Sequence, residues 1–262
     1  MKKLEKMLYE CQIGMYIDEL IKLKSGFIVY SKYVEDKSWN YFTCFKAFSR
    51  RSFLKLWEQA KDKFLELNRK PYIALSPSTR LAFGAKRYFD EHFELEERVT
   101  VMLCRGFDKK FDLDSDYTFK RIDNNLEKEV FINTFTTSKT QVLSGDTYDK
   151  LPSYYFDALR ASFEHSGEWE FIHYLSYYKS EPIGMVSVCK KGEYAGLYGG
   201  GTYAKFRGKG VFTNLLNFIS QQLQKEGVKY FFGITEKDSK NERYYNKLGW
   251  NEAFEIDVYY EQ

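Results

Sequence analysis

The chain has 262 residues, of which 44% are apolar and 19% aromatic, and its formal net charge is +3. This length suits one large domain or two small ones, and the apolar content is enough for a sizeable core. The near-neutral charge argues against a nucleic-acid partner bound through bulk charge. The four cysteines lie far apart and form no CxxC pair, so we expect neither a metal site nor disulfides.

The amino-terminal stretch MKKLEKMLYECQIGMYIDEL begins with basic residues but has no long apolar run. It does not resemble a signal peptide. No segment approaches the roughly 18 apolar residues that a membrane span needs. We therefore expect a soluble cytoplasmic protein with no membrane or nucleic-acid partner.

The first half of the chain predicts alternating helices and strands. Apolar residues recur at helical spacing over 52–67 and 81–92, and short β-rich runs occupy 71–77 and 99–104. The polar segment 107–116 has no periodicity, which indicates a linker.

The second half predicts a longer series of elements. In chain order these are strand 117–122, helices near 126–138 and 152–164, strands 170–178, 183–191 and 193–203, helix 211–225, strand 228–234, helix 239–248 and a final strand ending at 261. A β-α-β-α-β ending after several strands favours an α/β or α+β sheet domain.

A weak internal repeat links the two halves. Residues 71–103 resemble residues 229–260, since both give a strand, a helix with an Arg-Tyr pair, and a second strand. The repeat predicts two copies of one fold, split near residue 110. The first copy has Phe89 where the second has Tyr245, and it lacks the paired glycines found before the second copy's long helix.

Those glycines lie in KFRGKGVFTNLL, residues 205–216. The first N–H groups of a helix have no intrahelical acceptor, and the helix dipole adds partial positive charge there. Gly208 and Gly210 would let the main chain approach an anion closely, while Arg207 and Lys209 add charge. The loop thus predicts a phosphate or pyrophosphate site at 207–212, with a flexible basic turn as the plain structural alternative.

Two common nucleotide motifs do not fit this loop. A Walker loop would need glycine at 203 and Ser or Thr at 210, where the chain has Tyr203 and Gly210. The dinucleotide fingerprint fails because Ala204 stands where its third glycine belongs. The helix behind the loop has one apolar stripe, made of Val211, Phe212, Leu215, Leu216, Ile219 and Leu223. We expect its polar face to be solvated. That face consists of Asn217, Gln221, Gln224 and Lys225.

The strand, the loop and the helix together resemble motif A of the GNAT N-acetyltransferase superfamily, Arg-x-x-Gly-x-(Gly/Ala). Phe212 departs from it, since Gly or Ala is usual at that place. Residues 244–250, Tyr-Tyr-Asn-Lys-Leu-Gly-Trp, resemble motif B. The resemblance covers roughly 117–262. It implies an α/β (α+β) protein with two GNAT-like domains in tandem, each a mixed, mostly antiparallel sheet flanked by helices.

In this interpretation, residues 1–110 form a degenerate domain and residues 111–262 form the domain that binds acetyl-coenzyme A. The activity implied is direct transfer of an acetyl group from acetyl-coenzyme A to the primary amine of a small molecule or peptide. The residues implied in coenzyme binding are Gly201, Thr202, Tyr203, Arg207, Gly208, Lys209, Gly210, Val211 and Phe212, with either Asp238 or Asn241 on the pantetheine arm. The strand end 201–203 would point an N–H at the thioester carbonyl.

Tyr245 matches the family's general acid, which protonates the departing thiolate. A buried ring in an aromatic-rich core is the other interpretation. The general base stays open between His173, Glu236, a water relay and an amine that is already neutral. Glu193 lies on the strand before the loop, but about 26 Å from Gly201, which is too far.

Two further functions stay open at this point. The tandem arrangement resembles that of Fem-type aminoacyl transferases, which use aminoacyl-tRNA. A non-catalytic sensor that binds acyl-coenzyme A would also have the loop. The sequence leaves the acceptor and the oligomeric state undecided, with a homodimer among the options.

Overall fold

The computed structural model describes residues 2–122, 126–140 and 151–262. Contacts divide the chain into two compact units, each built from segments that are distant in sequence. The first unit comprises Met1–Met102, Ile234–Arg243 and Glu252–Gln262, and the second comprises Leu103–Gly233 and Tyr244–Asn251. The sequence analysis placed a boundary near residue 110 between two consecutive copies of one fold. That boundary stays a prediction.

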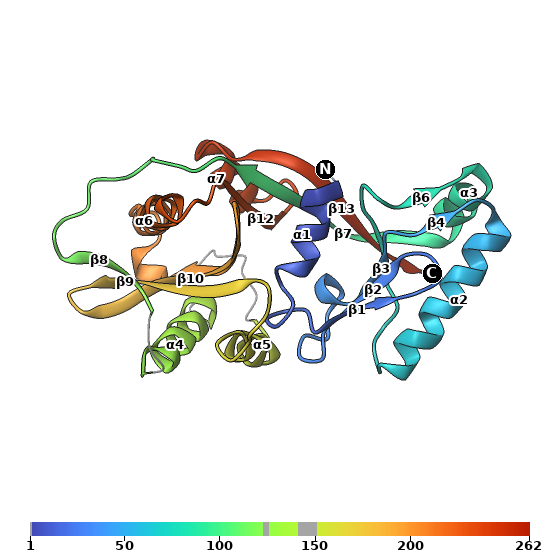
Figure 1. Ribbon diagram of the computed structural model, residues 1–262, viewed down its shortest axis with the longest axis horizontal. Coiled ribbons are helices and arrows are strands. Elements are labelled where there is room, and N and C mark those ends of the chain that lie inside the picture. The colour runs from blue at the N-terminus through green and yellow to red at the C-terminus, as the bar shows by residue number, and fades with distance from the viewer. Residues whose placement is uncertain (1, 123–125, 141–150) are drawn as a thin grey trace. The chain divides into compact units, whose positions relative to one another are not determined.

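The first unit is a sheet with helices (Figure 1). Its elements are α1 (Lys2–Glu10), β1 (Glu19–Lys22), β2 (Phe27–Tyr30), η1 (Lys37–Trp39), β3 (Tyr41–Thr43), β4 (Lys46–Ala47), α2 (Arg50–Glu66), β5 (Ile73–Leu75), β6 (Arg80–Leu81), α3 (Phe83–His92) and β7 (Phe93–Cys104), joined by the last strand of the chain, β13 (Asn251–Glu261). The sheet order is β1-β2-β3-β5-β13-β7, and β4 pairs separately with β6.

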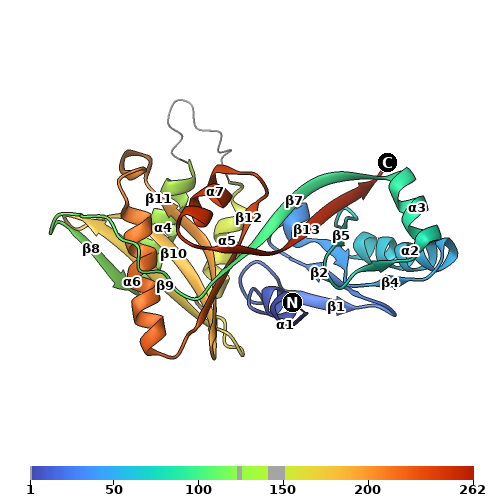
Figure 2. The same cartoon turned by 90° about the horizontal axis from the view of Figure 1, so that it is seen from above.

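The second unit holds the remaining elements, except that the end of β12 and the start of α7 lie in Ile234–Arg243 of the first unit. They are β8 (Tyr117–Arg121), α4 (Leu126–Thr140), α5 (Tyr154–Ser162), β9 (Glu170–Tyr178), β10 (Glu181–Lys191), β11 (Tyr194–Thr202), η2 (Ala204–Phe206), α6 (Val211–Lys225), β12 (Tyr230–Glu236) and α7 (Lys240–Lys247). The sheet order is β12-β11-β10-β9-β8. Helix α6 covers one face of this sheet, and α4 and α5 cover the other (Figures 1 and 2).

The two units share one pairing pattern. In the first, β1–β2 and β2–β3 are antiparallel, and β3–β5 is parallel with α2 between the two strands. In the second, β9–β10 and β10–β11 are antiparallel, and β11–β12 is parallel with α6 between them. Parallel neighbours need a crossover, and the two long amphipathic helices supply it. The repeat therefore corresponds to two copies of one topology.

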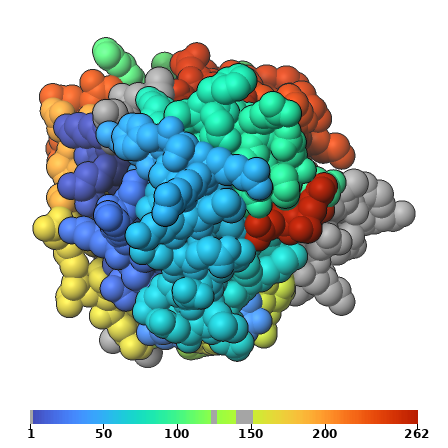
Figure 3. Space-filling view, turned by 90° about the vertical axis from the view of Figure 1, so that its right-hand side faces the viewer, coloured from blue at the N-terminus to red at the C-terminus, as the bar shows by residue number. Residues whose placement is uncertain are grey.

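The first unit has an aromatic core under α2. Phe53, Trp57 and Phe64 lie on one face of this helix and are buried against Phe42 and Phe45 from the sheet. Figure 3 shows α2 and α3 covering this side of the unit, with the end of β13 beside them. The Trp57 indole donates to Glu261 at 2.9 Å, so the last strand of the chain is fixed to the first unit.

The polar face of α6 is not simply solvated, and the sequence-based prediction for Asn217 is wrong. The segment 105–111, which follows β7, runs along α6 and is called the strap below. Polar side chains of α6 bind the backbone of this strap. Ser220 Oγ accepts from Phe107 N–H at 3.2 Å, Asn217 donates to Phe107 O at 3.5 Å, and Gln224 donates to Arg105 O at 3.4 Å. Asn217 is consequently buried.

Within the described ranges, no helix is both long enough and apolar enough to cross a bilayer.

Candidate functional site

A strand edge opens in the second unit where β11 leaves β12. The two strands pair in parallel only over Tyr194–Gly196 and Tyr230–Phe232. Strand β11 continues to Thr202 with β10 as its partner, and the register shifts between Met185 and Ser187 of β10. Three steps along β11 oppose two along β10 there, so β11 has a bulge, and Gly199 takes φ +59° at it.

The register identifies which backbone groups face this open edge. Tyr203 N–H donates to Ile183 O at 2.7 Å, so residue 203 faces β10, and Gly201 faces Met185 in the same way. Polar groups alternate along a strand. The C=O of Gly200, the N–H of Thr202 and the C=O of Thr202 therefore point away from β10, towards the side where β12 has separated.

Two cations bind the carbonyl oxygens on that edge. The Lys139 ammonium, from the last turn of α4, donates to Gly200 O at 2.8 Å. Arg207 Nε donates to Thr202 O at 3.1 Å, and its Nη2 donates to Ser138 O at 2.8 Å. The Arg207 side chain thus ties the loop to β11 and α4. Sequence reasoning missed Lys139, because a lysine in the last turn of a helix is an ordinary feature.

Burial and the Arg207 charge lower the pKa of Lys139 to about 8. The Lys139 side chain as a whole is half-buried. Perturbed groups of this kind concentrate at functional sites.

The loop after β11 leads into an uncapped helix. Gly210 is the N-cap of α6, takes the left-handed conformation (φ +82°) and makes no side-chain cap hydrogen bond. The N–H of Asn214 bonds to Gly210 O at 3.0 Å. The N–H groups of Val211, Phe212 and Thr213 come before the first helical acceptor and point along the helix axis. Lys209 and Gly208 are exposed beside them.

The Phe111 side chain lies against the start of α6. Asn214 holds the backbone of Phe111 by two bonds, accepting from its N–H at 2.7 Å and donating to its O at 2.8 Å. A Cβ at position 210 would lie 2.6 Å from the Phe111 side chain, so this strap requires glycine at 210. Phe111 itself stays 49% exposed.

The structure explains why a large side chain fits at position 212, where motif A usually has Gly or Ala. Its ring lies against Gly200, where a Cβ would come within 2.7 Å of the ring. The large side chain is therefore accommodated by the glycine run of β11, and both residues belong to the same unit.

The two adjacent tyrosines of α7 have different surroundings. Tyr244 Oη and Thr213 Oγ1 are 2.8 Å apart, which joins α7 to the first turn of α6. Burial raises the pKa of Tyr244 to about 12. The ring of Tyr245 packs at 5.1 Å from Trp250 and 5.5 Å from Tyr244. The contact through Thr213 assigns Tyr244 to the framework and leaves Tyr245 as the candidate acid.

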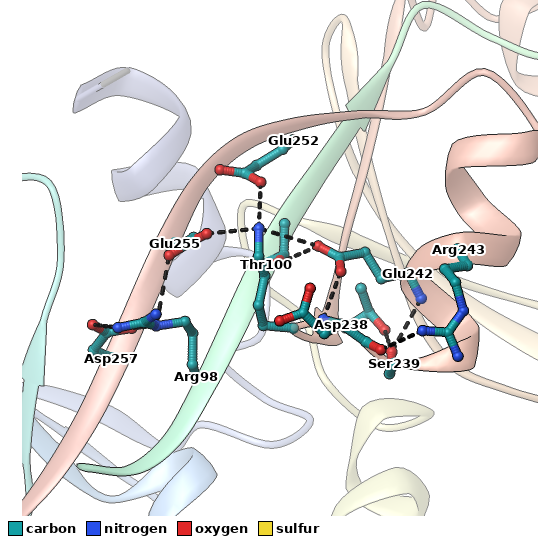
Figure 4. A network of polar contacts seen from close by, with 11 residues as sticks. Arg98, Thr100, Asp238, Ser239, Glu242, Arg243, Glu252, Glu255 and Asp257 are labelled. Atoms are coloured by element: carbon teal, nitrogen blue, oxygen red, sulfur yellow. Dashed lines mark hydrogen bonds and ion pairs between the residues drawn. The ribbon is translucent and has the colours of Figure 1, made fainter. Parts of the chain in front are cut away.

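Asp238 and Asn241 belong to the first unit. Both are exposed, and Asp238 takes φ +59° in the turn before α7. The buried carboxylate of Glu242 accepts from Asp238 N–H at 2.6 Å and from Thr100 Oγ1 at 2.7 Å (Figure 4). Ser239 Oγ accepts from Glu242 N–H at 3.1 Å and so caps the helix. A contact of Asp238 or Asn241 with pantetheine stays a prediction.

We expect Glu242→Ala to lower the free energy of unfolding by roughly 2–3 kcal/mol at pH 7, because it leaves the Asp238 N–H without its acceptor. Burial alone would raise the pKa of Glu242, but the hydrogen bonds from Thr100 and Asp238 and the Lys237 charge hold it below its ordinary value. A depressed pKa stabilises the fold above the ordinary value of 4.5, and this stabilisation disappears as the pH falls through the folded value. Thermal melts should show the largest gap between wild type and variant at neutral pH. A gap that widens on acidification would contradict this.

His173, one of the candidate bases, is buried in the second unit. Its Nδ1 lies 3.0 Å from Ser187 Oγ, and its ring stacks on Phe163 with centroids 3.8 Å apart. Burial lowers the pKa of His173 to about 3, so it is a neutral core residue. Glu193 forms an ion pair with Lys229 at the start of β11. Glu236 is exposed and belongs to the first unit.

In the first unit, side chains form hydrogen bonds at the start of α2 and at the end of β3, the elements that correspond to α6 and β11. Ser49 and Ser52 cap α2 reciprocally, with Ser52 N–H donating to Ser49 Oγ at 3.2 Å. Thr43 Oγ1 at the end of β3 donates to Ala74 O at 2.9 Å. Phe89 is fully buried and stacks on Phe93. The start of α2 thus has side-chain caps, whereas the start of α6 has Gly210 and no side-chain cap.

Comparison with known proteins agrees with this geometry. The family model described as "Acetyltransferase (GNAT) family" matches residues 138–250. That range contains β11, the loop, α6 and the Tyr245 segment. No curated protein sequence matches the chain.

Solved structures resemble the chain along nearly its whole length. A functionally unknown conserved protein from Staphylococcus epidermidis ATCC 12228 has 11% identity and a TM-score of 0.65, covering 93% of this chain and 94% of its own. A GCN5-related N-acetyltransferase from Kribbella flavida has 12% identity and a TM-score of 0.64, covering 96% and 93%. A tandem GNAT protein from the clavulanic acid biosynthesis pathway has 13% identity and a TM-score of 0.52, covering 79% and 69%.

Residues 138–250 therefore form a GNAT acetyltransferase domain. The predicted fold class is also confirmed: two GNAT-like α/β domains in tandem, each with a mixed, mostly antiparallel sheet flanked by helices.

Proposed function

We propose that the protein is an acetyl-coenzyme A-dependent N-acetyltransferase and that the second unit carries the site. The observation that supports this most directly is the open edge of β11 followed by the bare, glycine-capped tip of α6. An extended arm that carries amide groups can pair with the strand edge of β11, and a diphosphate can bind at the tip of α6. Coenzyme A has both groups in one molecule.

The residues present fit that ligand. The N–H groups of residues 208–213 would hold the pyrophosphate, with Lys209 adding charge at the surface. The Arg207 guanidinium already bonds to two carbonyl oxygens, so its main part is to hold the loop in place. The open edge of Gly200–Thr202 would pair with pantetheine, and Thr202 N–H would face the thioester carbonyl.

In the proposed reaction, the acceptor amine attacks the thioester carbon, the carbon–sulfur bond breaks, and the Tyr245 hydroxyl protonates the departing thiolate. The acceptor is the neutral primary amine of a small molecule or peptide. After the attack its nitrogen loses one proton to water, and Tyr245 regains a proton from water, so the products are the amide and the free thiol of coenzyme A.

Titration of the protein with coenzyme A tests the proposal. At a ligand concentration of about 100 times Kd, binding should stabilise the fold by about 2.7 kcal/mol and raise Tm by roughly 5 °C or more. Calorimetry should give one site per chain, since the first unit has no glycine loop before its long helix. A thiol-release screen with acetyl-coenzyme A and a panel of amines, polyamines, aminoglycosides and peptides then identifies the acceptor. The proposal fails if coenzyme A gives neither heat nor a shift in Tm.

A further inference from the structure

Positive charge is concentrated in two short segments of the first unit. Residues 46–57 contain four lysines and arginines and no acidic residue, and residues 80–89 contain three and no acidic residue. The formal net charge of the whole chain is only +3, so the rest of the chain carries a net negative charge. The near-neutral total therefore conceals two strongly basic segments.

The fold brings these two segments together (Figures 1 and 2). Strands β4 and β6 pair in parallel, with Ala47 opposite Leu81, so both strands end on the same side. The helices that follow them, α2 and α3, also begin close together, since a Cβ on Gly84 would lie 4.0 Å from Arg50 N. The Arg50 guanidinium lies 4.6 Å from the centre of the Tyr88 ring, which joins α2 to α3.

Two exposed phenylalanines follow the shared end of β4 and β6. Ala82 N–H donates to Ala47 O at 2.9 Å, and Phe48 and Phe83 are the next residues after this bonded pair. Phe48 is 79% exposed and Phe83 is 86% exposed. Single exposed apolar residues are ordinary, whereas neighbouring ones rimmed by polar groups mark interaction surfaces.

The cations that come with these rings are exposed to solvent. They are Lys46, Arg50, Arg51 and Arg80. The first acidic residue after each basic segment, Glu58 or Asp90, forms an ion pair with a lysine of its own helix. We call the two phenylalanines and these four cations the basic aromatic patch.

We propose that the basic aromatic patch docks on a membrane surface rich in anionic phospholipids. Cations gain free energy beside the lipid phosphates, and exposed phenyl rings gain it on leaving water for the boundary between headgroups and acyl chains. Lysine or arginine beside phenylalanine is typical of surfaces that lie in this interface. Both rings are almost fully exposed, so they can enter the interface without any rearrangement of the unit.

This contact is peripheral and needs no membrane-spanning helix. It differs from the expectation of no membrane partner, because that expectation rested on the lack of an apolar run long enough to span. It also does not depend on the proposed function, since all the residues of the patch belong to the first unit.

Co-sedimentation of the full chain with lipid vesicles tests the proposal. One vesicle preparation contains equal amounts of phosphatidylglycerol and phosphatidylcholine, and the other contains phosphatidylcholine alone. We expect the wild type to bind the anionic vesicles at least about tenfold more tightly than the neutral ones. Raising the salt concentration should weaken this binding, because salt screens exposed charges.

The apolar part of the patch is tested by a double variant, Phe48→Ser with Phe83→Ser. Its affinity for the anionic vesicles should fall by about tenfold or more, because two apolar side chains no longer leave water. Leu65→Ser is the matched control. Leu65 is 81% exposed near the other end of α2, where Lys63 pairs with Glu66, so this change should leave vesicle binding unaltered.

The charged part is tested by Lys46→Gln with Arg51→Gln, which should lower the same affinity by about tenfold or more. Lys61→Gln with Lys63→Gln removes the same charge from α2, but these lysines are paired with Glu58 and Glu66. The control should change the affinity by less than about threefold. Thermal melts should give an unchanged Tm for both patch variants, since the replaced side chains are exposed.

Equal binding to anionic and neutral vesicles, or equal losses in the patch variants and their controls, would overturn the proposal. So would two other results, each obtained without vesicle binding. A single-stranded oligonucleotide that binds the wild type, and the patch variants much less, would make the patch a nucleic-acid surface. Self-association that disappears in Phe48→Ser with Phe83→Ser would make it a contact between copies of the chain.

Discussion

Replacing Tyr245 by phenylalanine is expected to slow acetyl transfer by about 10²- to 10³-fold, with the affinity for coenzyme A unchanged within about twofold. A positioned general acid contributes a factor of this size. The change removes one hydroxyl and leaves the ring packed on Trp250 and Tyr244. Steady-state thiol release gives kcat, and calorimetry gives the affinity.

Tyr244→Phe is the matched control, since it removes the neighbouring hydroxyl on the same helix. That hydroxyl bonds to Thr213 at 2.8 Å, so its loss should cost about 1 kcal/mol of stability and change kcat by less than about threefold. A large loss of kcat in Tyr244→Phe, with none in Tyr245→Phe, would exchange the two roles. Coenzyme A binding without acetyl transfer to any amine in the wild type would favour the sensor.

Replacing Gly210 by alanine is expected to weaken coenzyme A binding by about 30-fold, which corresponds to about 2 kcal/mol. The methyl group meets two obstacles. Residue 210 has φ +82°, and the new Cβ would lie 2.6 Å from the Phe111 side chain. Relief requires residue 210 to leave the left-handed region or the strap to shift. Either movement turns the first N–H groups of α6 away from their common direction.

Gly227→Ala separates backbone strain from the effect on the site. Gly227 follows the other end of α6, has φ +92°, and has no atom within 4 Å of an added Cβ. Both variants should lose roughly 1 kcal/mol or more of stability from the left-handed backbone, but only Gly210→Ala should lose coenzyme A affinity. Equal affinities in the two variants would contradict an anion site at the α6 tip.

Local patterns predicted much of the second unit. The apolar stripe placed α6 at Val211–Lys225, because helical spacing of apolar residues depends only on which face is buried. Strand β9 also coincides with its predicted bounds, Glu170–Tyr178. In the first unit, β1, β2 and β3 were not predicted, since strands of three or four residues are too short to show a period. Strand β7 begins at Phe93 rather than 99, because its first half is charged and largely exposed.

The sequence by itself determined the loop, the helix behind it and the resemblance to GNAT motifs, because glycine spacing and amphipathic periodicity are properties of neighbouring residues. Only the tertiary structure decided that His173 is a neutral core residue, that Asn217 binds a strap, and that Lys139 lies on the open edge of β11. Burial, register and the approach of α4 to β11 depend on segments that are about 60 residues apart in the chain. No local pattern encodes such contacts.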